Sequence, residues 1–383
     1  MAKKKKIETV QKTSTDLTYE QKLERARETV AQSKKDGTGL TFASEMREME
    51  FISTGIEALD RLMGAYSTGP NPEYLGRGGI PRGRYVVVWG PELCGKSTLL
   101  YRIIAKAQAQ EKVCLLVDAE SRATVPWMQA QGVDTSTLLW HRGGVLENTL
   151  QTLIEQISMV DFAVIDTVNA LAPKSELEDN KGAARGMKDD APMGRTAASL
   201  SKFFRIATHR VSTANVSVVL VGQARDAIGA QVPMKQIVGG NALAHYATIR
   251  LNISKITGQS SLDGASIPKK KVTSTAGDII EVPSGFLQKI KLEKAGTNHL
   301  ENQHILVPFL YGLGPDDFKS NIMAAVAAGI IGVNGPGRYE VPTRDGVVNI
   351  HGKEALIEFF QKDTSFYEWL MNSVTKTKEE VEE

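Results

Sequence analysis

Cysteine is scarce in this chain, and its scarcity excludes two classes of protein. The 383 residues include only two cysteines, Cys94 and Cys114, and their spacing fits no zinc-binding pattern. A chain of this length can bury a large core without disulfide bonds or a structural metal. We therefore expect a protein of a reducing, cytoplasmic compartment.

Long apolar runs and an excess of charge of one sign are also missing. The longest apolar run, Ile322–Ile331, has about half of the ~20 residues that a membrane-spanning helix needs. The lysine-rich start of the chain is followed by no apolar segment, so we expect no secretory signal and no membrane partner. The 46 basic and 44 acidic residues nearly balance. Binding of nucleic acid would therefore depend on local basic patches.

Four segments differ in their patterning. In order, they are a predicted N-terminal helical oligomerisation segment (1–50), a core domain (51–315), a small C-terminal α+β domain (316–374) and an acidic tail (375–383). The first contains a charged, helix-forming stretch at Leu17–Lys35, whose narrow apolar stripe indicates packing on a neighbour. The third contains predicted helices at Asn321–Ala328 and Lys353–Leu370.

Short apolar runs alternate with helical stretches in the core domain. The runs are Arg84–Trp89, Val113–Val117, Phe162–Ile165 and Val216–Val221, separated by helical stretches such as Ser97–Gln110 and Val145–Ser158. Runs that are apolar on both faces are typical of parallel strands covered by helices. We predict an α/β fold with a doubly wound, mostly parallel sheet. The later runs lack intervening helices, which indicates an antiparallel extension of the same sheet; they are Ala247–Ile253, Phe286–Leu292 and Gln303–Phe309.

A glycine-rich motif follows the first of these strands. It reads G-x-x-x-x-G-K-S and consists of Gly90, Pro91, Glu92, Leu93, Cys94, Gly95, Lys96 and Ser97. In such a motif, backbone N–H groups and the helix N-terminus bind phosphate oxygens. Lys96 would contact the β- and γ-phosphates, and the Ser97 hydroxyl would bind Mg²⁺. Because it stands between a strand and a helix, the motif predicts a site for ATP and Mg²⁺.

Three polar residues follow other buried strands, at the sheet edge where the phosphates are expected. Asp166 ends one strand and is a predicted ligand of Mg²⁺. Glu120 follows another strand and could accept a proton from a water that attacks the γ-phosphate. Gln223 follows a third, where a neutral amide could sense the γ-phosphate. On pattern alone, each could also be an ordinary polar residue that opens a loop.

Several motifs together resemble the RecA recombinase family, including its viral relatives. They are Ile52–Gly55 with Ala58–Asp60, Gly90–Thr98, Asp118–Glu120, Ala170–Lys174, and Gly239–Leu243 with Tyr246 and Arg250–Leu251. The resemblance runs from about Ile52 to Gly314, and the motifs occur in the order of the family. It implies that the core domain is a RecA-like P-loop ATPase.

The resemblance also assigns roles around the nucleotide. It implies that Glu120 is the general base and that Gln223 is the γ-phosphate switch. It further implies nucleotide contacts from Thr98, Trp127, Tyr311 and Gly312, with the Trp127 ring stacked on adenine. In the family, lysines of a neighbouring subunit approach the γ-phosphate. Lys294 fits one such position, but Gly296 stands where a second lysine is common, so the group acting across the interface is left open.

Two long segments without apolar periodicity follow the expected phosphate edge, at Ser175–Gly194 and Ala224–Gly240. Basic residues among glycines can follow the backbone of single-stranded DNA. Arg195 and Arg205 lie about three helical turns apart, roughly on one face of the helix between the segments. With the resemblance, the predicted DNA-binding residues are Met193, Gly194, Arg195, Arg205, Arg225, Lys235, Gly239, Gly240 and Asn241.

These features imply an ATP-dependent DNA recombinase. We expect it to form a homo-oligomeric helical filament on single-stranded DNA, to hydrolyse ATP with stimulation by DNA, and to exchange strands with homologous double-stranded DNA. A RecA-like hexameric helicase or motor would share the same nucleotide residues. A non-hydrolysing DNA-binding filament scaffold is the other alternative, but it would not need Glu120 as a base.

Overall fold

The computed structural model describes residues 17–36, 39–46, 48–178, 184, 195–226, 235–237, 241–257, 267–273, 279–343 and 346–375. The chain divides into two compact units, Met1–Met49 and Glu50–Glu383. In the first unit, α1 (Tyr19–Asp36) buries Val30 and Ser33. A short 3₁₀ helix, η1 (Ala43–Glu45), is joined to it by an ion pair of 3.0 Å between Lys34 and Glu45. The predicted helix is present, and its role in oligomerisation stays a prediction.

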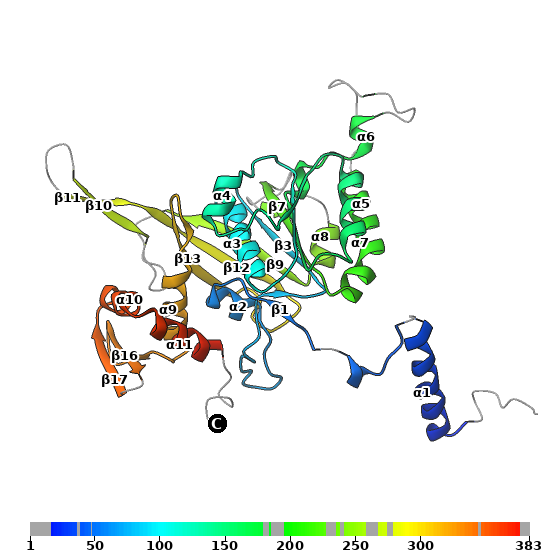
Figure 1. Ribbon diagram of the computed structural model, residues 1–383, viewed down its shortest axis with the longest axis horizontal. Coiled ribbons are helices and arrows are strands. Elements are labelled where there is room, and N and C mark those ends of the chain that lie inside the picture. Colours follow the sequence, from blue (N-terminus) through cyan, green and yellow to red (C-terminus); the bar gives the residue numbers. More distant parts are fainter. Residues whose placement is uncertain are drawn as a thin grey trace, which may run out of the picture. The chain divides into compact units, whose positions relative to one another are not determined.

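A ten-stranded sheet forms the centre of the second unit (Figure 1). Its path is β14-β13-β12-β9-β3-β7-β6-β4-β5, with β8 paired to β7. The strands are β3 (Tyr85–Gly90), β4 (Cys114–Asp118), β5 (Leu139–Arg142), β6 (Phe162–Asp166), β7 (Ser217–Asp226), β8 (Lys235–Ile237), β9 (Ile249–Ile256), β12 (Gly285–Ala295), β13 (His304–Leu310) and β14 (Gly314–Pro315).

The direction of the strands confirms the predicted α/β sheet. Neighbours from β5 through β4, β6, β7 and β3 to β9 are parallel. From β9 onward, β12, β13 and β14 continue the sheet in antiparallel order. The antiparallel extension therefore begins one strand later than we expected, because β9 is parallel to β3 and antiparallel only to β12.

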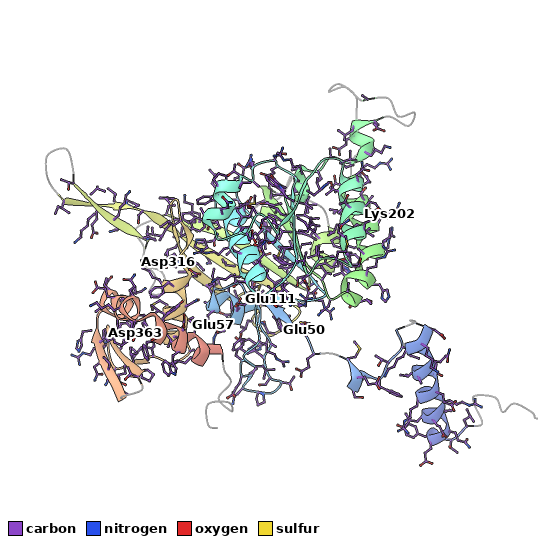
Figure 2. The ribbon with its side chains drawn as sticks, in the orientation of Figure 1. Glu50, Glu57, Glu111, Lys202, Asp316 and Asp363 are labelled. Atoms are coloured by element: carbon purple, nitrogen blue, oxygen red, sulfur yellow. The ribbon has the colours of Figure 1, made fainter. Side chains whose placement is uncertain are left out.

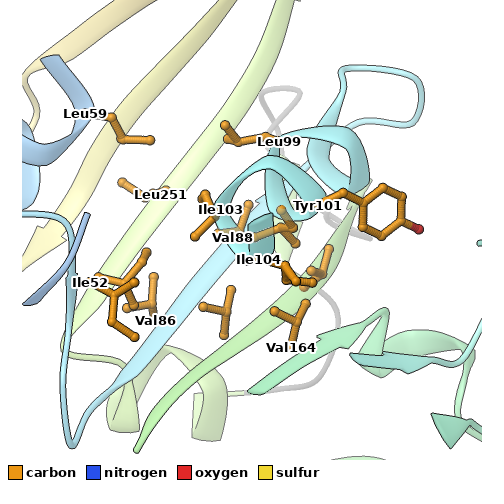
Figure 3. Close-up of a cluster of buried hydrophobic side chains, with 14 of the residues drawn as sticks. Ile52, Leu59, Val86, Val88, Leu99, Tyr101, Ile103, Ile104, Val164 and Leu251 are labelled. Atoms are coloured by element: carbon orange, nitrogen blue, oxygen red, sulfur yellow. The ribbon is translucent and has the colours of Figure 1, made fainter. Parts of the chain in front are cut away.

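Helices cover both faces of the sheet, and alternate residues of β3 are buried on opposite faces. Val86 and Val88 belong to one buried cluster, and Tyr85 and Val87 belong to another on the opposite face. The first cluster packs under α2 (Glu57–Met63), α3 (Lys96–Ala109) and α4 (Val125–Ala130), and Figure 3 shows its aliphatic side chains around α3. The second packs under α5 (Leu146–Gln156), α7 (Arg195–Thr213) and α8 (Asn241–Tyr246). Burial on both faces explains why these strands read as continuous apolar runs.

The C-terminal part has a buried cluster of its own. Its elements are α9 (Asp317–Ala327), a three-stranded sheet of β15 (Gly332–Val333), β16 (Arg338–Thr343) and β17 (Gly346–His351), α10 (Lys353–Lys362) and α11 (Thr364–Thr375). The single predicted helix over Lys353–Leu370 is wrong. It is broken at Asp363, whose carboxylate accepts hydrogen bonds from the Phe366 backbone N–H (3.0 Å) and the Ser365 hydroxyl (2.7 Å) and so starts a new helix (Figure 2). The domain boundary at residue 315 stays a prediction.

Two small β pairs complete the second unit. β1 (Phe51–Ile52) pairs with β2 (Ile80–Pro81), and β10 (Lys269–Thr273) pairs with β11 (Ile279–Pro283). Among the described residues, no helix combines the length and the apolar character that crossing a bilayer requires.

Candidate active site

The glycine-rich motif forms the turn between β3 and α3, and two of its glycines are required by close packing. A Cβ on Gly90 would overlap the carbonyl oxygen of Ile253. Gly95 has a φ of +84°, and a Cβ there would lie 2.6 Å from the Phe309 ring and 2.8 Å from the Gln288 side-chain nitrogen. A Gln288 hydrogen bond of 2.7 Å to the Cys94 carbonyl supports the turn from β12. The loop is thus held close to the antiparallel part of the sheet.

Lys96 occupies the interior of this turn. Its side chain is buried, and Nζ donates hydrogen bonds to the carbonyls of Pro91 (2.6 Å) and Gly90 (3.1 Å). The Cys94 thiol also donates to the Pro91 carbonyl at 3.0 Å, and burial raises its pKa. Cys94 is therefore a packed thiol that shapes the loop. The other side chains of the turn, Glu92 and Leu93, are exposed, so any contact they make with phosphate would come from the backbone.

Ser97 and Asp166 meet beside the turn, as the predicted Mg²⁺ site requires. The Asp166 carboxylate is 7% exposed, and the Ser97 hydroxyl lies near enough to counter in part the rise of its pKa. Burial raises the pKa of Asp166 to about 6, and the nearby Glu120 carboxylate adds to the rise. A hydroxyl and a carboxylate are ligands that suit Mg²⁺, which usually completes its shell with phosphate oxygens and water. Among the described residues there is no cluster of three metal-binding side chains, so the protein alone would supply only part of that shell.

Glu120 and Gln223 also lie together. Gln223 Nε2 donates a hydrogen bond of 2.7 Å to Glu120 Oε1, and the Thr167 hydroxyl donates to the same oxygen at 2.9 Å. The Gln223 backbone N–H is held by the Asn169 side chain at 2.9 Å. The carboxylate and the amide proposed to act on a γ-phosphate are thus joined directly, although β6 separates β4 from β7 in the sheet.

The sequence reasoning missed three residues of this site. The two oxygens of Asp118 accept hydrogen bonds from the backbone N–H groups of Arg122 (3.2 Å) and Ala123 (3.1 Å) and fix the loop that carries Glu120. The Arg122 side chain forms an ion pair of 3.1 Å with Glu120 Oε2. Tyr101 lies on α3 beside the aliphatic cluster (Figure 3). Burial, together with the nearby carboxylates of Asp166, Asp118 and Glu120, raises the pKa of its hydroxyl. Asp118 could have been found from the motif Asp118–Glu120, whereas Arg122 and Tyr101 belong to no motif.

Trp127, which is predicted to stack on adenine, contacts Thr98, and the chain after β13 passes near the same residue. The Trp127 indole N–H donates to the Thr98 hydroxyl at 3.4 Å. A Cβ on Gly314 would lie 3.1 Å from the Thr98 methyl group, so the turn that contains Tyr311 and Gly312 passes close to α3. Tyr311 is 54% exposed and Trp127 is half-buried. Their stacking on adenine stays a prediction.

Lys294 contacts α8 of its own chain rather than the phosphate turn. It follows an irregularity in the pairing of β12 with β9, and its Nζ donates hydrogen bonds to the carbonyls of Ala244 (3.2 Å) and His245 (3.0 Å) in α8. Burial and the nearby Arg250 lower the pKa of this lysine. Its action across a subunit interface stays a prediction.

Arg195 and Arg205 are exposed on α7 and lie on the same side of it. Both line a shallow hollow of about 520 Å³ together with Lys174 and Lys202 (Lys202 is labelled in Figure 2). The first predicted loop begins as a short helix, α6 (Lys174–Leu177), and residue 184 pairs with Glu178. The spacing of the two arginines therefore predicted their shared face correctly.

The second predicted loop is partly strand, which corrects the expectation of a segment without regular structure. β7 continues to Asp226, and β8 pairs with it in antiparallel register, with Arg225 opposite Gln236 and Asp226 opposite Lys235. Asn241 begins α8. Met193, Gly194, Gly239 and Gly240 lie outside the described residues, as do the side chains of Arg225, Lys235 and Asn241.

Comparison with known proteins identifies the family. The sequence model of the RecA N-terminal domain matches residues 22–276. The chain belongs to the RecA family. It is 33% identical over 335 residues to the DNA repair protein recA homolog 3, mitochondrial, of Arabidopsis thaliana. The matched segment covers 86% of this chain and 68% of the plant protein.

Bacterial members of the family match a shorter part. Protein RecA of Colwellia psychrerythraea is 34% identical over 212 residues, 55% of this chain and 56% of its own length. Protein RecA of Allorhizobium ampelinum is 36% identical over 213 residues, 55% of this chain and 53% of its own length. The chain thus spans about half the length of these two RecA proteins. The resemblance inferred from the motifs and the RecA-like fold are both confirmed.

Proposed function

We propose that this chain is an ATP-dependent DNA recombinase that assembles on single-stranded DNA as a helical filament and exchanges strands with homologous double-stranded DNA. Membership of the RecA family and the names of its relatives, one a DNA repair protein, support a role in recombination or repair. One structural observation supports the proposed coupling between ATP and DNA. The Gln223 amide is bonded to the Glu120 carboxylate, and β7, which bears Gln223, leads directly into the second predicted DNA segment.

The proposed reaction is hydrolysis of ATP. The backbone of the turn and Lys96 would hold the β- and γ-phosphates, and Mg²⁺ bound between Ser97, Asp166 and the phosphates would neutralise their charge. Glu120 takes one proton from a water molecule, and the water oxygen forms a bond to the γ-phosphorus. The bond from the γ-phosphorus to the bridging oxygen breaks, and ADP leaves with that electron pair.

The proposed coupling to DNA depends on the state of Gln223. With a γ-phosphate present, the amide has an anionic partner other than Glu120, and its strand adopts the position that favours DNA binding. Once the γ-phosphate has left, the amide returns to Glu120 and the DNA-binding state loses that support. ATP therefore shifts a population between two states rather than driving a stroke.

A direct test measures ATP hydrolysis with and without single-stranded DNA, and then strand exchange between homologous molecules. We expect DNA to stimulate hydrolysis, and strand exchange to require ATP. Lys96→Ala should abolish both activities, because the loop would lose its only buried cation for the phosphates among the described residues. Electron microscopy with ATP and DNA should reveal helical filaments. Closed rings would instead indicate the hexameric motor, and DNA-bound filaments without hydrolysis would indicate the scaffold.

A further inference from the structure

Arg122 covers the open side of the Glu120 carboxylate. Oε1 of Glu120 already accepts hydrogen bonds from Thr167 and Gln223, and Oε2 is paired with Arg122 Nη1 at 3.1 Å. Both oxygens therefore have donors. These donors occupy three of the about four lone-pair positions of the carboxylate, and the departure of Arg122 would leave Oε2 open to a proton from an attacking water.

Of the three donors, Arg122 is the most exposed, and its departure would free Oε2, whereas the proposed movement of Gln223 would free a position on Oε1. The side chain of Arg122 is 71% exposed, whereas the side chain of Glu120 is 16% exposed. The backbone N–H of Arg122 donates a hydrogen bond of 3.2 Å to Asp118, so the guanidinium can move while the backbone of Arg122 stays in place. An ion pair with so exposed a partner is weak and costs little to break.

A triphosphate would be a stronger partner for this guanidinium than Glu120 is. Phosphate oxygens carry more negative charge than one carboxylate, and they match the planar fork of arginine donors. Of the other cations of the site, Lys96 lies inside its own turn, from which it is proposed to contact the β- and γ-phosphates, and Lys294 bonds to the carbonyls of α8. The second family lysine is replaced by Gly296. Arg122 is thus a further positive group within the chain, besides Lys96, for the γ-phosphate.

We propose that Arg122 is a catalytic residue that switches partner when ATP binds. This inference rests on the proposed hydrolysis of ATP. Without a γ-phosphate, Arg122 pairs with Glu120 Oε2 and competes with water for that oxygen. With a γ-phosphate, the guanidinium moves to its oxygens, where it stabilises the charge that develops as the bond to ADP breaks. The same movement frees Oε2 to accept the proton of the attacking water, so this oxygen has no competing arginine when the substrate is in place.

The test compares Arg122→Ala and Arg122→Lys with the parent chain, and Arg338→Ala serves as a matched control because Arg338 is an exposed arginine of the C-terminal part. Affinities for AMP-PNP and for ADP are measured by competition with a fluorescent nucleotide, and ATP hydrolysis is measured with and without single-stranded DNA. For Arg122→Ala we expect affinity for AMP-PNP and kcat each to fall by roughly 10- to 100-fold, as for a lost charge-assisted hydrogen bond. Affinity for ADP should stay unchanged, and Arg122→Lys should recover part of both losses.

Glu120→Gln provides the reciprocal measurement. It removes the charge that holds Arg122, so this variant should bind AMP-PNP at least as tightly as the parent while its kcat falls. The proposal is overturned if Arg122→Ala binds AMP-PNP as the parent does, or if it hydrolyses ATP as fast as the parent or faster. Lys96→Ala distinguishes failure of the proposed ATP hydrolysis from failure of the Arg122 partner switch. If that variant still binds and hydrolyses ATP, the proposed function itself fails; if only the Arg122 variants behave like the parent, the partner switch alone is wrong.

Discussion

The side-chain amide of Gln223 donates a hydrogen bond of 2.7 Å to the carboxylate of Glu120. The two residues are 103 positions apart in sequence, and they meet because β7 and β4 end at the same edge of the sheet. Gln223 within β7 therefore contacts the proposed catalytic carboxylate, and its strand continues toward the segment that pairs as β8.

Replacing Gln223 should uncouple nucleotide state from DNA affinity. In Gln223→Ala, the ratio of single-stranded DNA affinities with AMP-PNP and with ADP should fall toward one, because the amide that distinguishes the two states is gone. Fluorescence anisotropy with labelled DNA measures both affinities. Gln151→Ala, on the exposed face of α5, is the control and should keep the parental ratio. A parental ratio in Gln223→Ala would rule out the switch.

A side chain at position 90 should destabilise the phosphate turn. In Gly90→Ala the new methyl group would overlap the Ile253 carbonyl, whereas a Cβ at Gly144 would meet nothing within 4 Å. We expect Gly90→Ala to lower the free energy of unfolding by roughly 1–3 kcal/mol, and Gly144→Ala to change it far less. Urea denaturation gives both values. Equal stability of the two variants would show that the turn can move away from β9.

Reversing the charge at Arg225 should weaken binding to single-stranded DNA and reduce its dependence on salt. Each lost phosphate contact should lower the slope of log affinity against log salt by about 0.7 for a single strand. Titrations of Arg225→Glu at several salt concentrations measure this slope, with Arg338→Glu as the control for net charge. An unchanged slope would mean that Arg225 is not on the phosphates.

Stability should depend on pH through Glu57. Its side chain is buried in α2, and burial raises its pKa to about 7 from 4.5 in spite of the Arg61 guanidinium at 2.7 Å. The folded state therefore binds this proton more tightly than the unfolded state, so the stability it contributes is present below pH 4.5 and is lost as the pH rises to 7. The loss should be on the order of 3 kcal/mol.

Glu57→Gln should remove this loss. Parent and variant should unfold with similar free energies near pH 4.5, and the variant should be the more stable at pH 8. Glu358→Gln, at an exposed position of α10, is the control and should follow the parent at both pH values. A difference between Glu57→Gln and the parent that does not grow with pH would contradict the shifted pKa.

Local patterns were enough to predict much of the fold. The strands and helices around the phosphate turn were predicted to within a few residues, because parallel strands buried on both faces leave continuous apolar runs in the sequence. The predictions failed where a side chain makes a new local contact or where strands pair at a distance. Asp363 begins a second helix inside a stretch that reads as one, and β8 gains its structure only by pairing with β7.

The sequence by itself determined the glycine-rich turn with its lysine and serine, because such a motif depends on residues next to one another. Only the tertiary structure decided that Thr167, Gln223 and Arg122 all donate to Glu120. Arg122 follows Glu120 by two residues in the same loop, but Thr167 and Gln223 come from other strands, and no spacing along the chain encodes their meeting with Glu120. Their contacts follow from the order of parallel strands in the sheet, which brings these parts of the chain together at one carboxylate.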